Sequence, residues 1–212
     1  METIDDIFGI LGVLLLFVNC ILFFKSYHSK IDSAIKFFTI YLTISFLINT
    51  VSIILARNGI NNLYLSHFYF ISQFIFVSLY YRQLFNNRQK KMVNAMGLLV
   101  FIVLGIQYST NPTLYYKFNL LEIFLTSFPL VVYSIIHLYN SLSEEGKYMY
   151  INSGILMYLT TSTLIFILGN FLSDLDRQTT KNIWFLNKVL YIVYLILILL
   201  EWKKSLSQAK NR

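Results

Sequence analysis

Two residues of opposite charge, Glu122 and Lys188, each stand inside a long apolar stretch of this 212-residue chain. A charge surrounded by hydrocarbon is costly, so it is expected to pair, to reach the membrane surface or to serve a function. Both residues lie at a similar depth, roughly 7–8 Å from one end of their stretches. The sequence therefore predicts an ion pair between Glu122 and Lys188. The alternative is that the flexible stem of Lys188 carries its ammonium group to the nearer surface.

Five of the apolar stretches carry uncharged polar residues with helical spacing, and two of these five also carry the charges. Residues three, four or seven positions apart share one helix face, so each stretch carries a polar stripe. A single such residue often serves only to hold helices together. The stripes taken together predict an outward-facing pocket with polar groups and aromatic walls, of roughly 300 Å³ or more. The residues predicted to line it are Asn49, Tyr69, Gln73, Glu122, Asn170, Trp184, Asn187, Lys188 and Tyr191.

Catalytic and metal-binding motifs are not evident in the sequence. The histidines at 28, 67 and 137 have no H-x-x-x-H spacing, and Cys20 is the only cysteine. These residues give neither zinc ligands nor a cysteine cluster, and no phosphate-binding loop or nucleophile elbow is present. We expect no enzyme, no metal site and no cofactor. His67 is expected to be a residue of the membrane interface.

The elements that must position these residues are seven apolar stretches of membrane-spanning length. Only 13% of the residues are charged and 57% are hydrophobic, whereas soluble domains carry about 25% charged residues. Stretches of this length and polarity predict transmembrane helices. The fourth is the weakest, because it is short and contains Asn94, Gly97 and Gly105. The predicted spans are 7–25, 33–56, 64–83, 92–108, 117–139, 149–172 and 183–202 of one all-α transmembrane domain, residues 1–212.

The distribution of basic residues predicts an orientation. Segments 25–36, 82–91 and 203–212, with Lys147, hold twelve of the seventeen lysines and arginines. Positively charged segments stay on the cytoplasmic side, so we expect the N-terminus outside and the C-terminus in the cytoplasm. Because membrane topology accounts for the net charge of +7, nucleic acid is not an expected partner. The expected partner is the lipid bilayer.

Three segments resemble a family of uncharacterised bacterial seven-helix membrane proteins. They are NNLYLSHFYFISQFIFVSLYYRQLF (61–85), YINSGILMYLTTSTLIFILGNFL (150–172) and NIWFLNKVLYIVYLILILLEWKK (182–204). The resemblance implies the fold and the topology, and it implies no activity. We expect the protein to lie in a bacterial inner membrane. Rhodopsins are a poorer match, because Trp184 stands where a microbial rhodopsin carries an aspartate. The tripeptide of G-protein-coupled receptors is also absent.

The predicted function is that of a sensory, receptor-like or accessory membrane protein. It would accept a small ligand or lipid group in the outward pocket and signal to a separate partner, because the connecting segments are too short to form an output domain. One alternative is a small-solute transporter or channel, whose polar track would continue through Ser153, Thr160 and Tyr194. Another is a structural subunit of a membrane complex, in which the polar stripes would join helices.

Overall fold

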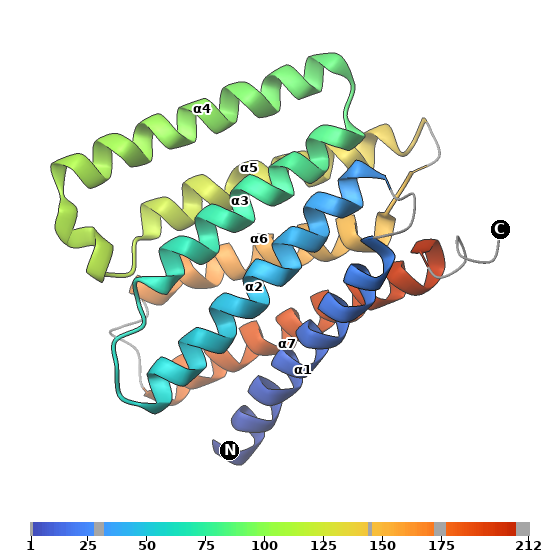
Figure 1. The fold of residues 1–212 in the computed structure, drawn as a ribbon. Coiled ribbons are helices and arrows are strands. Elements are labelled where there is room, and N and C mark those ends of the chain that lie inside the picture. The colour runs from blue at the N-terminus through green and yellow to red at the C-terminus, as the bar shows by residue number, and fades with distance from the viewer. Residues whose placement is uncertain (1, 28–31, 144–145, 172–176, 207–212) are drawn as a thin grey trace.

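Seven long α-helices make up nearly all of the computed structural model (Figure 1). The structure describes residues 2–27, 32–143, 146–171 and 177–206. At residues 2, 3, 27, 168–171 and 177 it describes only the backbone. Each predicted span coincides with one helix, so the all-α prediction is confirmed, and no strand occurs among the described residues. A short 3₁₀-helix and a short π-helix follow α4 and α7 respectively. The helices are α1 (Glu2–Tyr27), α2 (Ser33–Arg57), α3 (Leu65–Leu84), α4 (Asn87–Thr110), η1 (Pro112–Tyr116), α5 (Leu120–Asn140), α6 (Met149–Phe171), α7 (Arg177–Glu201) and η3 (Trp202–Leu206).

Six of the helices form a closed ring in the order α1, α2, α3, α5, α6, α7, with α7 packing back against α1. The fourth helix, α4, lies outside this ring beside α3 (Figure 1). The helices alternate in direction, which places the start of α1 and the end of α7 at opposite ends of the bundle. We call these the N-terminal end and the C-terminal end.

Six of the seven helices are long and apolar enough to cross a membrane, which makes the chain a multi-pass membrane protein. The exception is α3, and the prediction that the fourth span is the weakest is therefore wrong. Hydropathy indicates which helices can face lipid. In contrast, α3 is enclosed by α2, α4 and α5. Enclosure allows it to carry buried polar residues such as His67, Gln73 and Ser78, whereas outlying α4 must be apolar.

Polar caps fix where several helices begin. The Asn86 side chain accepts hydrogen bonds from the amides of Arg88 and Gln89, and the Gln89 side chain accepts from the amide of Asn86. This reciprocal cap satisfies amides that have no partner within the first turn of α4. Asn119 caps α5 by accepting from the amide of Glu122. That cap also positions the Glu122 side chain at the N-terminal end.

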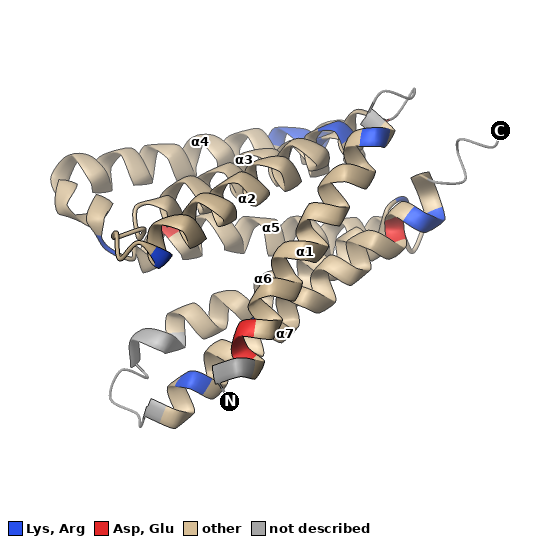
Figure 2. Cartoon of the chain, turned by 60° about the horizontal axis from the view of Figure 1, so that its bottom comes forward, with Lys and Arg blue, Asp and Glu red and all other residues tan. Residues whose placement is uncertain are grey.

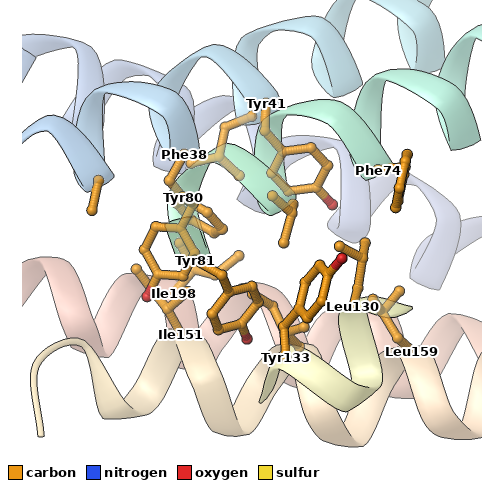
Figure 3. Close-up of a cluster of buried hydrophobic side chains, with 14 of the residues drawn as sticks. Phe38, Tyr41, Phe74, Tyr80, Tyr81, Leu130, Tyr133, Ile151, Leu159 and Ile198 are labelled. Atoms are coloured by element: carbon orange, nitrogen blue, oxygen red, sulfur yellow. The ribbon is translucent and has the colours of Figure 1, made fainter. Parts of the chain in front are cut away.

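The core inside the ring is rich in aromatic residues. Figure 3 shows side chains from α2, α3, α5, α6 and α7 pointing toward one another. Phe38, Tyr80 and Tyr81 are each fully buried, and the ring centroids of Tyr80 and Tyr81 lie 5.0 Å apart. The Tyr81 hydroxyl donates to the amide oxygen of buried Asn152 at 2.8 Å. The Tyr81–Asn152 contact is thus satisfied within the core, whereas the buried hydroxyls of Tyr80 and Tyr133 have no hydrogen-bond partner among the described residues.

The outlying helix α4 is held to the ring at its two ends. Near the C-terminal end Gln89 and Asn140 exchange amide hydrogen bonds of 3.0 and 3.1 Å, and near the N-terminal end Gln107 exchanges similar bonds with Asn119. An apolar groove of about 350 Å³ lies between α3, α4 and η1. Its lining includes Phe68, Ile71 and Ile75. We call it the α3–α4 groove.

Candidate functional site

The N-terminal end of the ring contains a cavity of about 440 Å³ between α1, α2, α3, α6 and α7. This size falls within the range of small-molecule sites, roughly 300–1,000 Å³. Its walls combine aromatic and aliphatic side chains with amide, hydroxyl and ammonium groups. The aromatic lining residues are Phe8, Tyr69, Phe70, Phe118, Tyr158, Phe166 and Tyr191.

Five of the nine residues predicted to form a pocket line this cavity: Asn49, Tyr69, Asn187, Lys188 and Tyr191. Two others lie close by without lining it. Gln73 is buried and donates a hydrogen bond of 3.1 Å to the Tyr41 hydroxyl. Trp184 is 40% exposed and packs from outside against Phe166, with ring centroids 5.7 Å apart.

The remaining two predicted residues are not placed in the cavity. The side chain of Asn170 lies outside the described part of the chain. Glu122 lies in a separate cluster described below, so its assignment to the pocket is wrong. The wall predicted to come from the fifth helix comes from α1 instead, because α1 and not α5 packs against α7.

Tyrosines form the wall of the cavity that faces the core. The rings of Tyr158 and Tyr194 are stacked with centroids 5.2 Å apart, and Tyr191 lies 5.4 Å from Tyr158. The Tyr194 hydroxyl donates to that of Tyr41 at 3.4 Å. These contacts fix the rings before any ligand enters, which keeps the entropic cost of binding low.

Lys188 pairs with Asp5, and the predicted pairing with Glu122 is therefore wrong. The Lys188 Nζ atom lies 2.6 Å from Oδ2 of Asp5, and the two side chains are 39% and 44% exposed. Helical spacing places Asp5 one turn before Gly9 and two before Gly12, both of which line the cavity. The pair therefore stands at the rim of the cavity on the α1 side.

Since the Lys188–Asp5 pair is well exposed, we expect it to contribute little to stability. Lys188→Met should reduce the free energy of unfolding by less than about 1 kcal/mol, as exposed ion pairs usually do. Reversible unfolding in mixed detergent micelles, followed by circular dichroism, measures this change. A loss of several kcal/mol would mean that Lys188 has a buried role that its exposed position does not indicate.

Glu122 belongs to a buried cluster with His67 and Tyr108. The Nδ1 atom of His67 lies 3.1 Å from both carboxylate oxygens, and the Tyr108 hydroxyl donates to Oε2. Asn119 Nδ2 in turn donates to the Tyr108 oxygen at 3.2 Å. His67 and Glu122 are 3% and 1% exposed. We call these residues the histidine–glutamate cluster.

The hydrogen bonds of His67 determine where one proton of the cluster lies. Its Nε2 atom lies 3.0 Å from the carbonyl oxygen of Tyr115, and a carbonyl can only accept, so Nε2 carries a proton. All of the cluster's partners lie in α3, α4, α5 and η1, so the cluster joins these elements rather than facing the cavity. The expectation that His67 is an interface residue is wrong.

Several cavity residues were not predicted from the sequence. Gly9 and Gly12 belong to a first span that had no polar stripe, and Asn62 precedes the third helix. The spacing of Asp5, Gly9 and Gly12 on one face was the available signal. A Cβ atom at Gly12 would lie 3.5 Å from the Tyr191 ring, at ordinary contact distance, so alanine would fit there and only a larger side chain would press on the contact between α1 and α7.

Comparisons with known proteins give no relative: no family model, curated protein or solved structure matches this chain. Among the described residues, no three histidine, cysteine, aspartate or glutamate side chains are grouped so that they could hold a metal ion. A second cavity of about 370 Å³ at the C-terminal end is lined by residues such as Asn86, His137 and Lys147. It contains none of the predicted pocket residues.

Proposed function

We propose that this protein is a receptor-like membrane protein that binds a small ligand in the cavity at its N-terminal end and acts through a separate partner. The observation that supports this most is the cavity itself, which five helices enclose and whose lining combines preset aromatic rings with polar groups. Cavities of this composition are typical of ligand sites. The connections between the helices are too short to form an output domain, which is why a partner is invoked.

The orientation belongs to the proposal. Figure 2 shows lysines and arginines gathered at the C-terminal end of the bundle, where α1 and α3 finish, while acidic residues lie at the start of α1. The positive-inside rule then supports seven spans with the cavity facing outward and the C-terminal end facing the cytoplasm of a bacterial inner membrane. The basic segment from Arg82 to Lys91 would be the surface closest to a cytoplasmic partner.

The transporter alternative has less support. Its polar track was expected to continue through Ser153 and Thr160, but both side chains are exposed on the outside of the ring. The buried polar residue of that helix half is Asn152, whose side chain is occupied by Tyr81 and Ser134. A structural subunit would not require a cavity. Neither alternative accounts for the aromatic walls.

Cysteine labelling in intact cells tests this proposal. On a Cys20→Ser background, Ser66→Cys in the cavity wall should react with a membrane-impermeant maleimide added outside. Cys20 is buried and its thiol donates to the Leu42 carbonyl at 3.1 Å, a bond that a serine hydroxyl can replace. Reaction at Ser66→Cys would show that the cavity is reached from outside.

Two matched variants calibrate the labelling. Thr113→Cys is exposed in η1 at the N-terminal end and should react from outside, whereas Ser143→Cys, exposed at the C-terminal end, should react only after permeabilisation. Reaction of Ser143→Cys in intact cells would reverse the orientation. Failure of Ser66→Cys alone, with Thr113→Cys reactive, would mean that the cavity is closed to the outside, and the receptor proposal would be abandoned.

A further inference from the structure

We infer that the ligand of the cavity is a small protonated amine with an aromatic or other apolar body. This inference rests on the proposed function and specifies the ligand class. It is carried by amide oxygens of lining residues that have no donor, by a carboxylate at the rim, and by the aromatic walls between them.

The acceptors are the side-chain oxygens of three asparagines. Asn49 Nδ2 donates to the Ser45 carbonyl at 2.8 Å, and Asn62 Nδ2 donates to the Ser52 carbonyl at 3.0 Å. Since a carbonyl can only accept, these bonds fix which end of each amide is nitrogen. The oxygens of Asn49 and Asn62 have no hydrogen-bond donor among the described residues.

Asn187 adds the strongest acceptor of the three. Its Oδ1 atom is buried, and no donor reaches it from the described part of the chain. A buried polar atom without a partner is costly, and in a cavity a ligand can supply that partner. All three residues line the same cavity, so a ligand group that donates hydrogen bonds can satisfy the oxygens of Asn49 and Asn62, and that of Asn187 once its side chain turns toward the cavity. An ammonium group has three such donors and no acceptor.

Asp5 supplies the opposite charge at the rim. It shares one face of α1 with the cavity residues Gly9 and Gly12. Its present partner, Lys188, is an ammonium group on a long stem that is 39% exposed. An incoming amine can replace Lys188 at Asp5, and the lysine can turn to water without burying its charge. A carboxylate ligand would instead compete with Asp5 for Lys188, and it would leave the oxygens of Asn49 and Asn62 without donors.

The aromatic walls suit the rest of such a ligand. Tyr69 and Tyr191 line the cavity beside the polar groups, and the face of an aromatic ring attracts a nearby cation. Phe70, Phe118 and Phe166 provide apolar surface further along the wall. An arylalkylamine presents an ammonium group and an apolar ring in the same arrangement.

The labelling assay also tests this inference. Phenethylamine, which is protonated at neutral pH, should slow maleimide labelling of Ser66→Cys and leave that of Thr113→Cys unchanged. Phenylpropionate has a similar ring and chain with a carboxylate in place of the ammonium group, and it should not protect Ser66→Cys. Asp5→Asn should raise the phenethylamine concentration needed for half-protection by about tenfold, because a charge-assisted hydrogen bond is lost.

Asp6→Asn is the matched control, because Asp6 is its exposed neighbour and should leave half-protection unchanged. Protection by phenylpropionate without protection by phenethylamine would overturn the amine assignment. Normal labelling of Ser66→Cys with no protection by phenethylamine would overturn it as well. In both cases the cavity would still open outward, whereas absent labelling of Ser66→Cys would contradict the proposed function itself.

Discussion

Glu122→Leu is expected to lower the free energy of unfolding by on the order of 3–5 kcal/mol, the usual loss when one partner of a buried charged pair is removed. Glu122 is 1% exposed, lies 3.1 Å from Nδ1 of His67 and accepts a hydrogen bond from the Tyr108 hydroxyl. Without it, the Nδ1 atom of His67 and the Tyr108 hydroxyl lose the carboxylate that both contact and keep only their contact with each other, at 2.9 Å. Equilibrium unfolding in mixed micelles measures the loss.

Double-mutant cycles separate this cluster from the rim pair. Glu122→Leu combined with His67→Leu should cost much less than the sum of the single changes, because both partners are then removed together. Glu122→Leu combined with Lys188→Met should be additive, because the two residues share no partner. Strong coupling between Glu122 and Lys188, with none between Glu122 and His67, would contradict the arrangement described above.

Gly154→Ala is expected to destabilise the protein by about 1–3 kcal/mol, as overpacking of a filled core does. A Cβ atom at Gly154 would lie 2.9 Å from Cδ2 of Tyr194, which is too close for carbon atoms. Tyr194 is 2% exposed and is held by its stacking on Tyr158 and its hydrogen bond to Tyr41. The ring cannot move aside without disturbing the tyrosines next to the cavity.

Gly97→Ala is the matched control for this change. Gly97 also lies within a helix, but a Cβ atom there would meet nothing within 4 Å. Alanine should therefore stabilise α4 slightly, by roughly 0.5–1 kcal/mol, because glycine is a poor helix former. Unfolding measured side by side should give opposite signs for the two variants. A neutral Gly154→Ala would mean that α6 and α7 can separate at little cost.

Hydropathy was sufficient to predict seven helices and their approximate bounds. It misjudged α3 and α4 because it measures suitability for lipid contact, and the position of α4 outside the ring cannot be read from its own residues. Helical spacing correctly grouped Asn187, Lys188 and Tyr191 on one face of α7. The order of helices around the ring remained unknown, so the sequence could not indicate that α1 brings Asp5 to Lys188.

The same limit applied to Glu122. Its predicted depth in the membrane is similar to that of Lys188, and the predicted ion pair rests on that depth alone. Which helices are neighbours decides a partner more strongly than depth does, and α5 packs against α3, α4 and α6. His67 lies in the first turn of α3, a helix that packs against α5, and it can therefore reach Glu122. A histidine four residues from a connecting segment gave no local indication that α4 and η1 would cover it.

Side-chain hydrogen bonds join α4 to the ring near its two ends, and between these ends lipid can pack against the helix. Hydrocarbon chains can lie along the α3–α4 groove where a protein side chain would otherwise fill it, and Leu98, Phe101 and Ile102 are exposed on α4. The length and thickness of those chains then influence how close α4 stays to the ring. We therefore expect the membrane to supply part of what holds α4 in place, beside the buried contacts of Val93, Val100 and Leu104.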